Sequence, residues 1–227
     1  MRNPDARQIL AMAILGAGVF AGTPSVFGGT PGEVPLEDIL QILVFEREIV
    51  AVDARGGGET RARLELGETV ASHSSRGQVA VALTNRRILA VGASSGSWQD
   101  AAFRKREQLI EAPVLGDRVA LVITTLRVLG FDGGSGNLVE TRLGVSERTV
   151  ARAVDSNVAI AVTDRRALGL SPFRGGLFEI PLYAKERLVS VEASGNMATV
   201  RTHSRLLTFR APSGTWSQRR LSLEDGF

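Results

Sequence analysis

The sequence of 227 residues contains no cysteine, two histidines, one tyrosine and two tryptophans. The absence of cysteine excludes disulfides, thiolate metal sites, a cysteine nucleophile and a lipid anchor on cysteine. The histidines, His73 and His203, belong to no spaced metal motif, and a zinc site would require further nitrogen or sulfur ligands. We therefore expect no metal site and no cofactor.

Motifs of the common enzyme classes are also missing. There is no Gly-x-Ser-x-Gly sequence, no phosphate-binding loop and no dinucleotide-binding fingerprint. Residues 132–137, followed by Glu140, carry oxygen ligands of the kind that calcium prefers, but they lack the spacing of an EF-hand loop. We interpret this stretch as a hairpin loop, and we expect a protein that is not an enzyme.

Lysine is scarce as well. Of the 27 lysines and arginines, only Lys105 and Lys185 are lysines, and the other 25 are arginines. The bias is typical of a GC-rich genome, although guanidinium groups also suit buried interfaces and carboxylate or phosphate partners. The formal net charge of +3 is too small to indicate nucleic-acid binding.

A short pattern is present five times, with a period of 39–40 residues. Its first marker is a threonine, or a phenylalanine in the first copy, at Phe45, Thr84, Thr124, Thr163 and Thr202. A charged residue follows three positions later, at Glu48, Arg87, Arg127, Arg166 and Arg205. A glycine follows nine positions after that, at Gly57, Gly96, Gly136, Gly175 and Gly214. Such regularity is the signature of a repeat architecture.

One repeat reads as four short strands. In the fourth copy these are residues 149–154, 157–162, 166–170 and 177–182, which are too short for helices. The second run is the most apolar in each copy, at residues 79–83, 119–123, 158–162 and 197–200, as expected for a strand buried on both faces. Four strands in about 40 residues match the blade of a β-propeller. We predict an all-β fold, a five-bladed propeller of about 39-residue blades over residues 36–227.

The glycine lies where a positive φ is needed, and two positions later most copies have a bulky apolar residue that we interpret as a wedge between blades. These residues are Trp98, Leu138, Leu177 and Trp216, with Glu59 in the first copy. The Ser-Gly-x-Trp sequences at 95–98 and 213–216 resemble the tryptophan-docking repeats of quinoprotein-like propellers. The resemblance implies the fold and not the quinone cofactor.

Parts of the sequence are also compatible with two other folds. The strand-turn-strand strings at 84–87 and 163–166 resemble bacterial pleckstrin-homology-like domains, but these need about a hundred residues each. A β-sandwich remains the competing fold. Within the first copy, strands are expected near residues 41–45, 49–53 and 60–66, and the innermost strand, near 32–36, has a poor signal.

The first 22 residues have a different character, because no charged residue occurs between Arg7 and Glu33. A hydrophobic helix is predicted there, whose membrane-facing residues would be Ile9, Leu10, Met12, Ile14, Leu15, Val19 and Phe20. Arg2 and Arg7 precede the segment, so the N-terminus would be cytoplasmic and the propeller periplasmic. A cleaved signal peptide and a buried core helix are the alternatives to a retained membrane anchor. Residues 23–35, rich in Gly and Pro, read as a linker.

The arginines of the repeated column are the best candidates for binding a partner. Equivalent strands would bring Arg87, Arg127, Arg166 and Arg205 to one face, with Arg86 and Arg165 beside them. Such a ring would suit carboxylates or lipid headgroups. The alternative is that each arginine covers the apolar edge of its own blade with its stem.

These features favour a non-catalytic scaffold, an accessory subunit of a bacterial membrane protein complex of the photosynthetic reaction-centre–antenna or respiratory kind. Its partners would be integral membrane subunits, with lipid headgroups as a further contact and no nucleic acid. The alternatives are a soluble periplasmic propeller that acts as an enzyme or ligand binder, and an envelope assembly factor.

Overall fold

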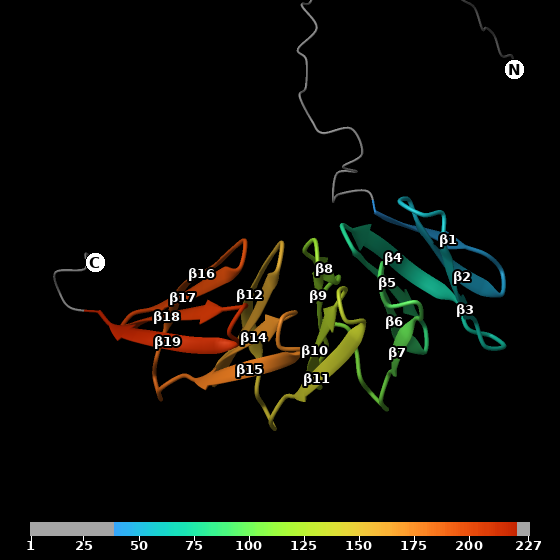
Figure 1. Cartoon of the computed structure of the whole chain (residues 1–227). Helices are drawn as coiled ribbons and strands as arrows, with labels where there is room; N and C mark the ends of the chain where they lie inside the picture. The colour runs from blue at the N-terminus through green and yellow to red at the C-terminus, as the bar shows by residue number, and fades with distance from the viewer. Residues whose placement is uncertain (1–38, 222–227) are drawn as a thin grey trace, which may run out of the picture. The chain divides into compact units, whose positions relative to one another are not determined.

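Residues 39–221 are described by the structure, a computed structural model, and they belong to the compact unit Val34–Phe227. They form nineteen strands and no helix. The strands make five antiparallel sheets that follow one another in chain order (Figure 1). The chain is thus an all-β, five-bladed β-propeller repeat protein, as the repeat predicts. The predicted helix (1–22) and linker (23–35) lie outside the described residues.

The strands of each blade pair in sequence order. Blade one contains β1 (Leu40–Val44), β2 (Glu48–Asp53) and β3 (Glu59–Arg63). Blade two contains β4 (Val70–Arg76), β5 (Val79–Thr84), β6 (Arg87–Gly92) and β7 (Gln99–Ala102). Blade three contains β8 (Val114–Leu115), β9 (Val119–Ile123), β10 (Arg127–Asp132) and β11 (Asn137–Arg142). Blade four contains β12 (Thr149–Asp155), β13 (Val158–Thr163), β14 (Arg166–Ser171) and β15 (Gly176–Pro181). Blade five contains β16 (Leu188–Ser194), β17 (Met197–Thr202), β18 (Arg205–Arg210) and β19 (Thr215–Arg220).

The apolar second strands form the centre of the core. Every residue of β5, β9 and β13 is buried, because each of these strands has a neighbouring blade on both faces. Alternate side chains point to opposite neighbours. In β5, for example, Val79 and Val81 pack against blade three, whereas Ala80 and Ala82 pack against blade one.

Small residues on the third strands allow the blades to approach closely. A Cβ atom on Gly130 would lie 2.7 Å from Leu170 of the next blade. One on Gly169 would lie 2.6 Å from the ring of Phe209. Each glycine therefore receives a large side chain of the following blade, and a larger residue there would force the blades apart.

The repeated glycine and the wedge act as the sequence predicts. All five glycines have a positive φ, between 63° and 74°, in the hairpin before the outermost strand of each blade. The Nε1–H of Trp98 donates to the carbonyl oxygen of Thr60 in the preceding blade, at 2.9 Å. Trp216 donates to the carbonyl oxygen of Phe178 at the same distance. The two tryptophans thus fasten their blades to the previous ones.

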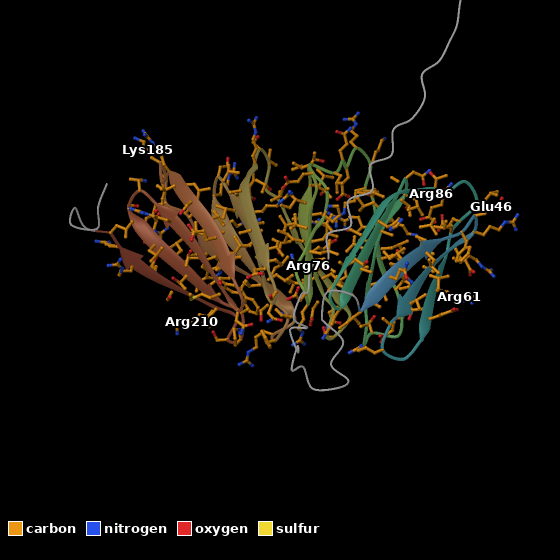
Figure 2. All side chains as sticks on the ribbon, turned by 90° about the horizontal axis from the view of Figure 1, so that it is seen from above. Glu46, Arg61, Arg76, Arg86, Lys185 and Arg210 are labelled. Atoms are coloured by element: carbon orange, nitrogen blue, oxygen red, sulfur yellow. The ribbon has the colours of Figure 1, made fainter. Side chains whose placement is uncertain are left out.

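The last blade differs from the prediction of a second strand buried on both faces. In β17, Ala198, Val200 and Thr202 are buried, whereas Met197 is exposed and Thr199 and Arg201 are half-buried. The reason is that no described blade follows it: blades one and five lie at opposite ends of the row in both views (Figures 1 and 2). One face of β17 therefore meets solvent, and its sequence alternates accordingly.

Candidate interaction surfaces

The four arginines of the repeated column are joined to the preceding blade. Arg205 shows the arrangement most completely. Its Nε donates to Glu186 Oε1 at 2.9 Å, and its Nη2 donates to Glu186 Oε2 at 2.6 Å. Nη2 also reaches the carbonyl oxygen of Pro181, at the end of β15 in blade four, and Nη1 donates to Gln218 of β19. Both charged side chains are almost fully buried.

The same network recurs at each junction between described blades. The acid partners lie 19 or 20 residues before the arginines and pair as Arg87–Glu68, Arg127–Glu107, Arg166–Glu147 and Arg205–Glu186. Each guanidinium also donates to a carbonyl oxygen of the preceding blade's outer strand or its end, at Arg63, Ala102, Arg142 and Pro181. Blades are therefore linked by paired, desolvated charges as well as by apolar packing.

The repeated threonine completes the network. The hydroxyl of Thr202 donates to Glu186 Oε1 at 2.6 Å and accepts the backbone N–H of Arg205 at 2.9 Å. Thr124 and Thr163 make the same contacts with Glu107 and Glu147. The marker that first revealed the repeat is thus part of an interblade hydrogen-bond network.

Each glutamate is presented by a tight turn between blades. The N–H of Glu186 bonds to the carbonyl of Tyr183, and the Tyr183 N–H bonds to the Glu186 carboxylate at 2.7 Å. Turns at 65–68, 104–107 and 144–147 have the same pair of bonds. The third residue of each has a positive φ, as in a type II turn, and these residues are Gly67, Arg106, Ser146 and Lys185.

These contacts keep the glutamates ionised. Burial by itself raises the pKa of Glu186, but hydrogen bonds from Arg205, Thr202 and the Tyr183 N–H outweigh it and lower that pKa to about 2. The pKa values of Glu68, Glu107 and Glu147 are lowered by the equivalent donors against the same burial. Sequence reasoning missed all four glutamates, although their spacing of 39, 40 and 39 residues follows the period.

The column therefore has a structural role in the fold. Two further predicted arginines lie nearer the surface: Arg86 contacts Glu65 and the carbonyl of Leu66, and Arg165 contacts the carbonyl of Val145. Binding of a partner by any of the six stays a prediction, and the contacts show that all six guanidinium groups already have partners within the chain.

The interblade turns and the hairpin turns that follow the second strands share one edge of the row, called the turn face below. Backbone bonds join them, as from Asn85 N–H to Thr69 O and from His203 N–H to Arg187 O. Figure 2 shows Lys185, Arg86 and Glu46 on this edge and Arg210 on the opposite one.

Apolar and cationic side chains alternate at the tips of the interblade turns. Leu66 is 96% exposed and Val145 is 90% exposed, so both apolar side chains stand in solvent. The second and fourth turns carry Lys105 with Arg106, and Lys185, which are exposed and have no ion pair within residues 39–221. The chain's only two lysines therefore both lie on the turn face.

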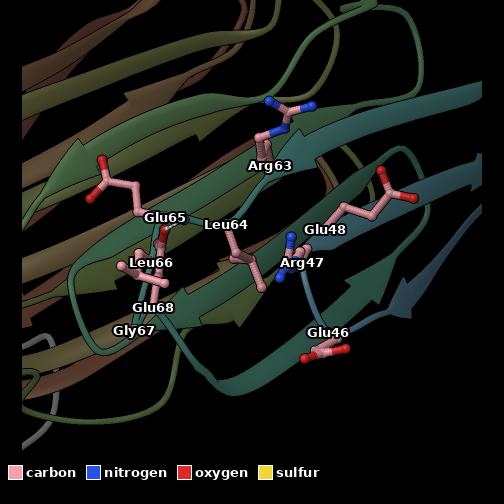
Figure 3. Close-up of a pocket in the computed structure, with 9 residues that line it drawn as sticks. All are labelled: Glu46, Arg47, Glu48, Arg63, Leu64, Glu65, Leu66, Gly67 and Glu68. Carbon is pink, nitrogen blue, oxygen red and sulfur yellow. Dashed lines mark hydrogen bonds between the residues drawn. The ribbon is translucent and has the colours of Figure 1, made fainter.

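Blade one departs from this network. Phe45 replaces the threonine and is 51% exposed, and Glu48 replaces the arginine. The only ion pair of Glu48 in the described chain is with Arg61, at 3.3 Å between two partly exposed groups. A hollow of about 580 Å³ lies at this end of the turn face, lined by Glu46, Arg47, Glu48 and residues 63–68 (Figure 3).

The histidines and the acidic loop that were considered as metal ligands lie apart from one another. His73 is exposed on β4, whereas Nδ1 of His203 accepts the Arg187 N–H at 3.0 Å. Asp132 accepts bonds from the Gly134 N–H and the Ser135 hydroxyl, which closes the hairpin loop. Within the described range, no group of three or more acidic or histidine side chains is placed to hold a metal ion.

The predicted membrane segment, from Ile9 to Phe20, lies outside the described residues. Among residues 39–221, no helix is long and apolar enough to span a bilayer.

Comparisons with known proteins return only structural similarity. No family model matches the sequence, and no curated protein does. A chain in the crystal structure of Kap60 bound to yeast RCC1 (Prp20) matches with a TM-score of 0.38, at 12% identity over 76% of this chain and 54% of that one. The WD40 domain of SCAP from fission yeast matches with a TM-score of 0.33, at 11% identity over 82% and 56%.

A bacterial structure, PorZ of the type-IX secretion system of Porphyromonas gingivalis, matches with a TM-score of 0.38, at 10% identity over 81% of this chain and 26% of that one. The chain spans little more than half the length of the first two matches and about a quarter of PorZ. The assignment as a five-bladed β-propeller repeat protein therefore rests on the strand pairing and blade packing of this chain.

Proposed function

We propose that the chain is a non-catalytic scaffold subunit of a bacterial membrane protein complex, whose propeller lies in the periplasm and binds a protein partner through the turn face. The observation that carries this proposal is the alternation at the turn tips. Leu66 and Val145 stand in solvent, and Lys105, Arg106 and Lys185 stand beside them. Apolar anchors among cations match an acidic protein surface that has an apolar patch.

The ionisable groups elsewhere support a scaffold rather than an enzyme. A general acid or base needs a titratable group whose pKa lies near the operating pH and which can reach substrate. The four interblade glutamates instead have lowered pKa values and are held by arginines between blades. The turn face combines exposed apolar tips with cations that have no ion pair within residues 39–221.

The chain's lysine content provides a selective test of this face. An amine-reactive cross-linker added to membranes can react only at Lys105, at Lys185 and at the chain's amino terminus. Purification in mild detergent and mass spectrometry should then identify membrane-protein peptides linked to Lys105 or Lys185. Recovery of only a monomeric 24.2 kDa species, with no cross-link at either lysine, would reject the proposal.

A charge-reversal pair separates this face from general electrostatics. Lys105→Glu with Lys185→Glu should reduce co-purification of the partner at least about tenfold, because each lost contact at the centre of an interface costs about 1 kcal/mol or more. The control, Arg174→Glu with Arg210→Glu, makes the same charge change away from the turn face and should leave co-purification unchanged. Equal losses in both variants would contradict the assignment to the turn face.

A further inference from the structure

Among residues 39–221, blade one has no counterpart of the innermost strand that the other four blades have. In those blades β4, β8, β12 and β16 pair with β5, β9, β13 and β17. The equivalent of β5 in blade one is β1, which pairs only with β2 in the described chain. One edge of β1 thus has no strand partner within the described part of the chain, and such an edge offers unpaired N–H and C=O groups to another strand.

A hollow adjoins the end of β1, on the side of blade two. A hollow of about 460 Å³ is lined by Val44 at the end of β1 and by residues 70–73 of β4. Innermost strands of neighbouring blades lie side by side elsewhere, as β12 does with β16. A strand added to β1 would likewise lie beside β4. Val44, 43% exposed, would be covered by the added strand.

The chain's own upstream sequence is poorly suited to this place. The segment that lies one period of 39 residues before β4 (70–76) is 31–37, and it includes Pro31 and Pro35. Proline has no N–H to donate to a strand ladder. In blade three, Pro113 directly precedes the innermost strand β8, which is only two residues long. The innermost strands β4, β12 and β16 contain no proline and have seven residues each.

The charge of Glu48 in blade one indicates which side chain the added strand should carry. In blades two, four and five, an arginine of the third strand meets a glutamate that lies two residues before the innermost strand, as Glu186 lies before Leu188. In blade one the arginine position is Glu48, so the polarity is reversed. A complementary strand would carry an arginine or lysine two residues before its start.

We propose that β1 binds an extended segment of a partner protein, a strand of about seven residues without proline, preceded by a basic residue that pairs with Glu48. This is β-strand addition, in which backbone bonds supply affinity and side-chain contacts supply specificity. The site is distinct from the turn-tip contact proposed above, and its test does not depend on that contact.

Synthetic peptides with the sequence of residues 183–194 serve as probes, because they include a complete innermost strand and its preceding turn. One peptide keeps Glu186 and the other carries Glu186→Arg. Fluorescence anisotropy with the full chain should show the arginine peptide binding at least about tenfold more tightly, as a charge-assisted hydrogen bond predicts. The variant Glu48→Arg should reverse this preference.

Glu59→Arg is the matched control, since it makes the same charge change on β3 outside the repeated column and should keep the preference for the arginine peptide. A preference that Glu48→Arg leaves unchanged, or that Glu59→Arg reverses equally, would overturn the role of Glu48.

A disulfide locates the peptide, because the chain has no other cysteine. In blade five Ser190 opposes Arg201, whose equivalent in blade one is Val44. The arginine peptide with Ser190→Cys should therefore cross-link to Val44→Cys, and far less to Ala102→Cys on the outer strand β7. Equal yields at the two positions would overturn the proposal. So would spontaneous closure of a Glu33→Cys/Val44→Cys disulfide in the full chain, which would identify the chain's own upstream segment as the occupant.

Discussion

The inner blades and the terminal blades follow the same repeat but differ wherever a neighbour is missing. The faces that blades two, three and four turn to their successors are apolar and have Ala90, Gly130 or Gly169 at the position that receives the next blade's large side chain. Blade five has Thr208 there, with Thr199 and Arg201 on the strand beside it. A polar outer face is what a terminal, capping repeat requires.

Blade one ends the row in another way. Its exposed apolar residues include Leu43, 40% exposed, and Val44, 43% exposed, and one edge of β1 is unpaired among residues 39–221. Thus the outer face of blade five has polar side chains, whereas blade one has exposed apolar side chains and a sheet of three described strands. Strand addition at blade one, as proposed above, would complete the sheet at the end that has the apolar surface.

The largest contrast should come from the arginine column. Arg127→Met removes a buried cation and leaves Glu107 and Glu140 without it, which should cost about 3–5 kcal/mol in the free energy of unfolding. Glu48→Met, at the equivalent position of blade one, should cost less than about 1 kcal/mol, because its ion pair is exposed. Urea unfolding measures both variants. Equal costs would mean that the column does not distinguish inner junctions from the first blade.

Acid should weaken the inner junctions through the same glutamates. Because the pKa of Glu186 is about 2 in the folded chain and 4.5 is its ordinary value, its contribution to stability is present above pH 4.5 and is lost as the pH falls toward 2. Unfolding free energy measured between pH 5 and 2 should fall less steeply for Glu186→Gln than for the unsubstituted chain. Glu147→Gln in blade four should behave alike. Parallel curves would contradict this linkage.

A smaller effect should separate the packed face of blade four from the solvent face of blade five. Gly169→Val places a branched side chain against the Phe209 ring and should cost about 1–3 kcal/mol through overpacking. Thr208→Val, at the equivalent position of blade five, should change stability by less than about 0.5 kcal/mol. Thermal unfolding distinguishes the two. A cost for Thr208→Val as large as that for Gly169→Val would indicate that the last blade has a neighbour in solution.

Much of the fold was predictable because its determinants are local or recur with the period. The turn glycines, the apolar second strands and the wedge at Trp98 and Trp216 all follow from residue type and spacing. The interblade network was not predicted, since Arg205 and Glu186 are 19 residues apart and only blade stacking brings them together. The half-exposed β17 could have been predicted, because Thr199 and Arg201 interrupt its apolar run.

The interblade turns also have a conformational consequence. Arg106, Ser146 and Lys185 adopt a left-handed backbone that costs an L-amino acid about 1–2 kcal/mol, whereas the equivalent Gly67 avoids that cost. Backbone preference favours glycine at all four turns. Arg106 and Lys185 adopt this conformation although glycine would do so at no cost, and their exposed side chains contribute no ion pair within the described blades.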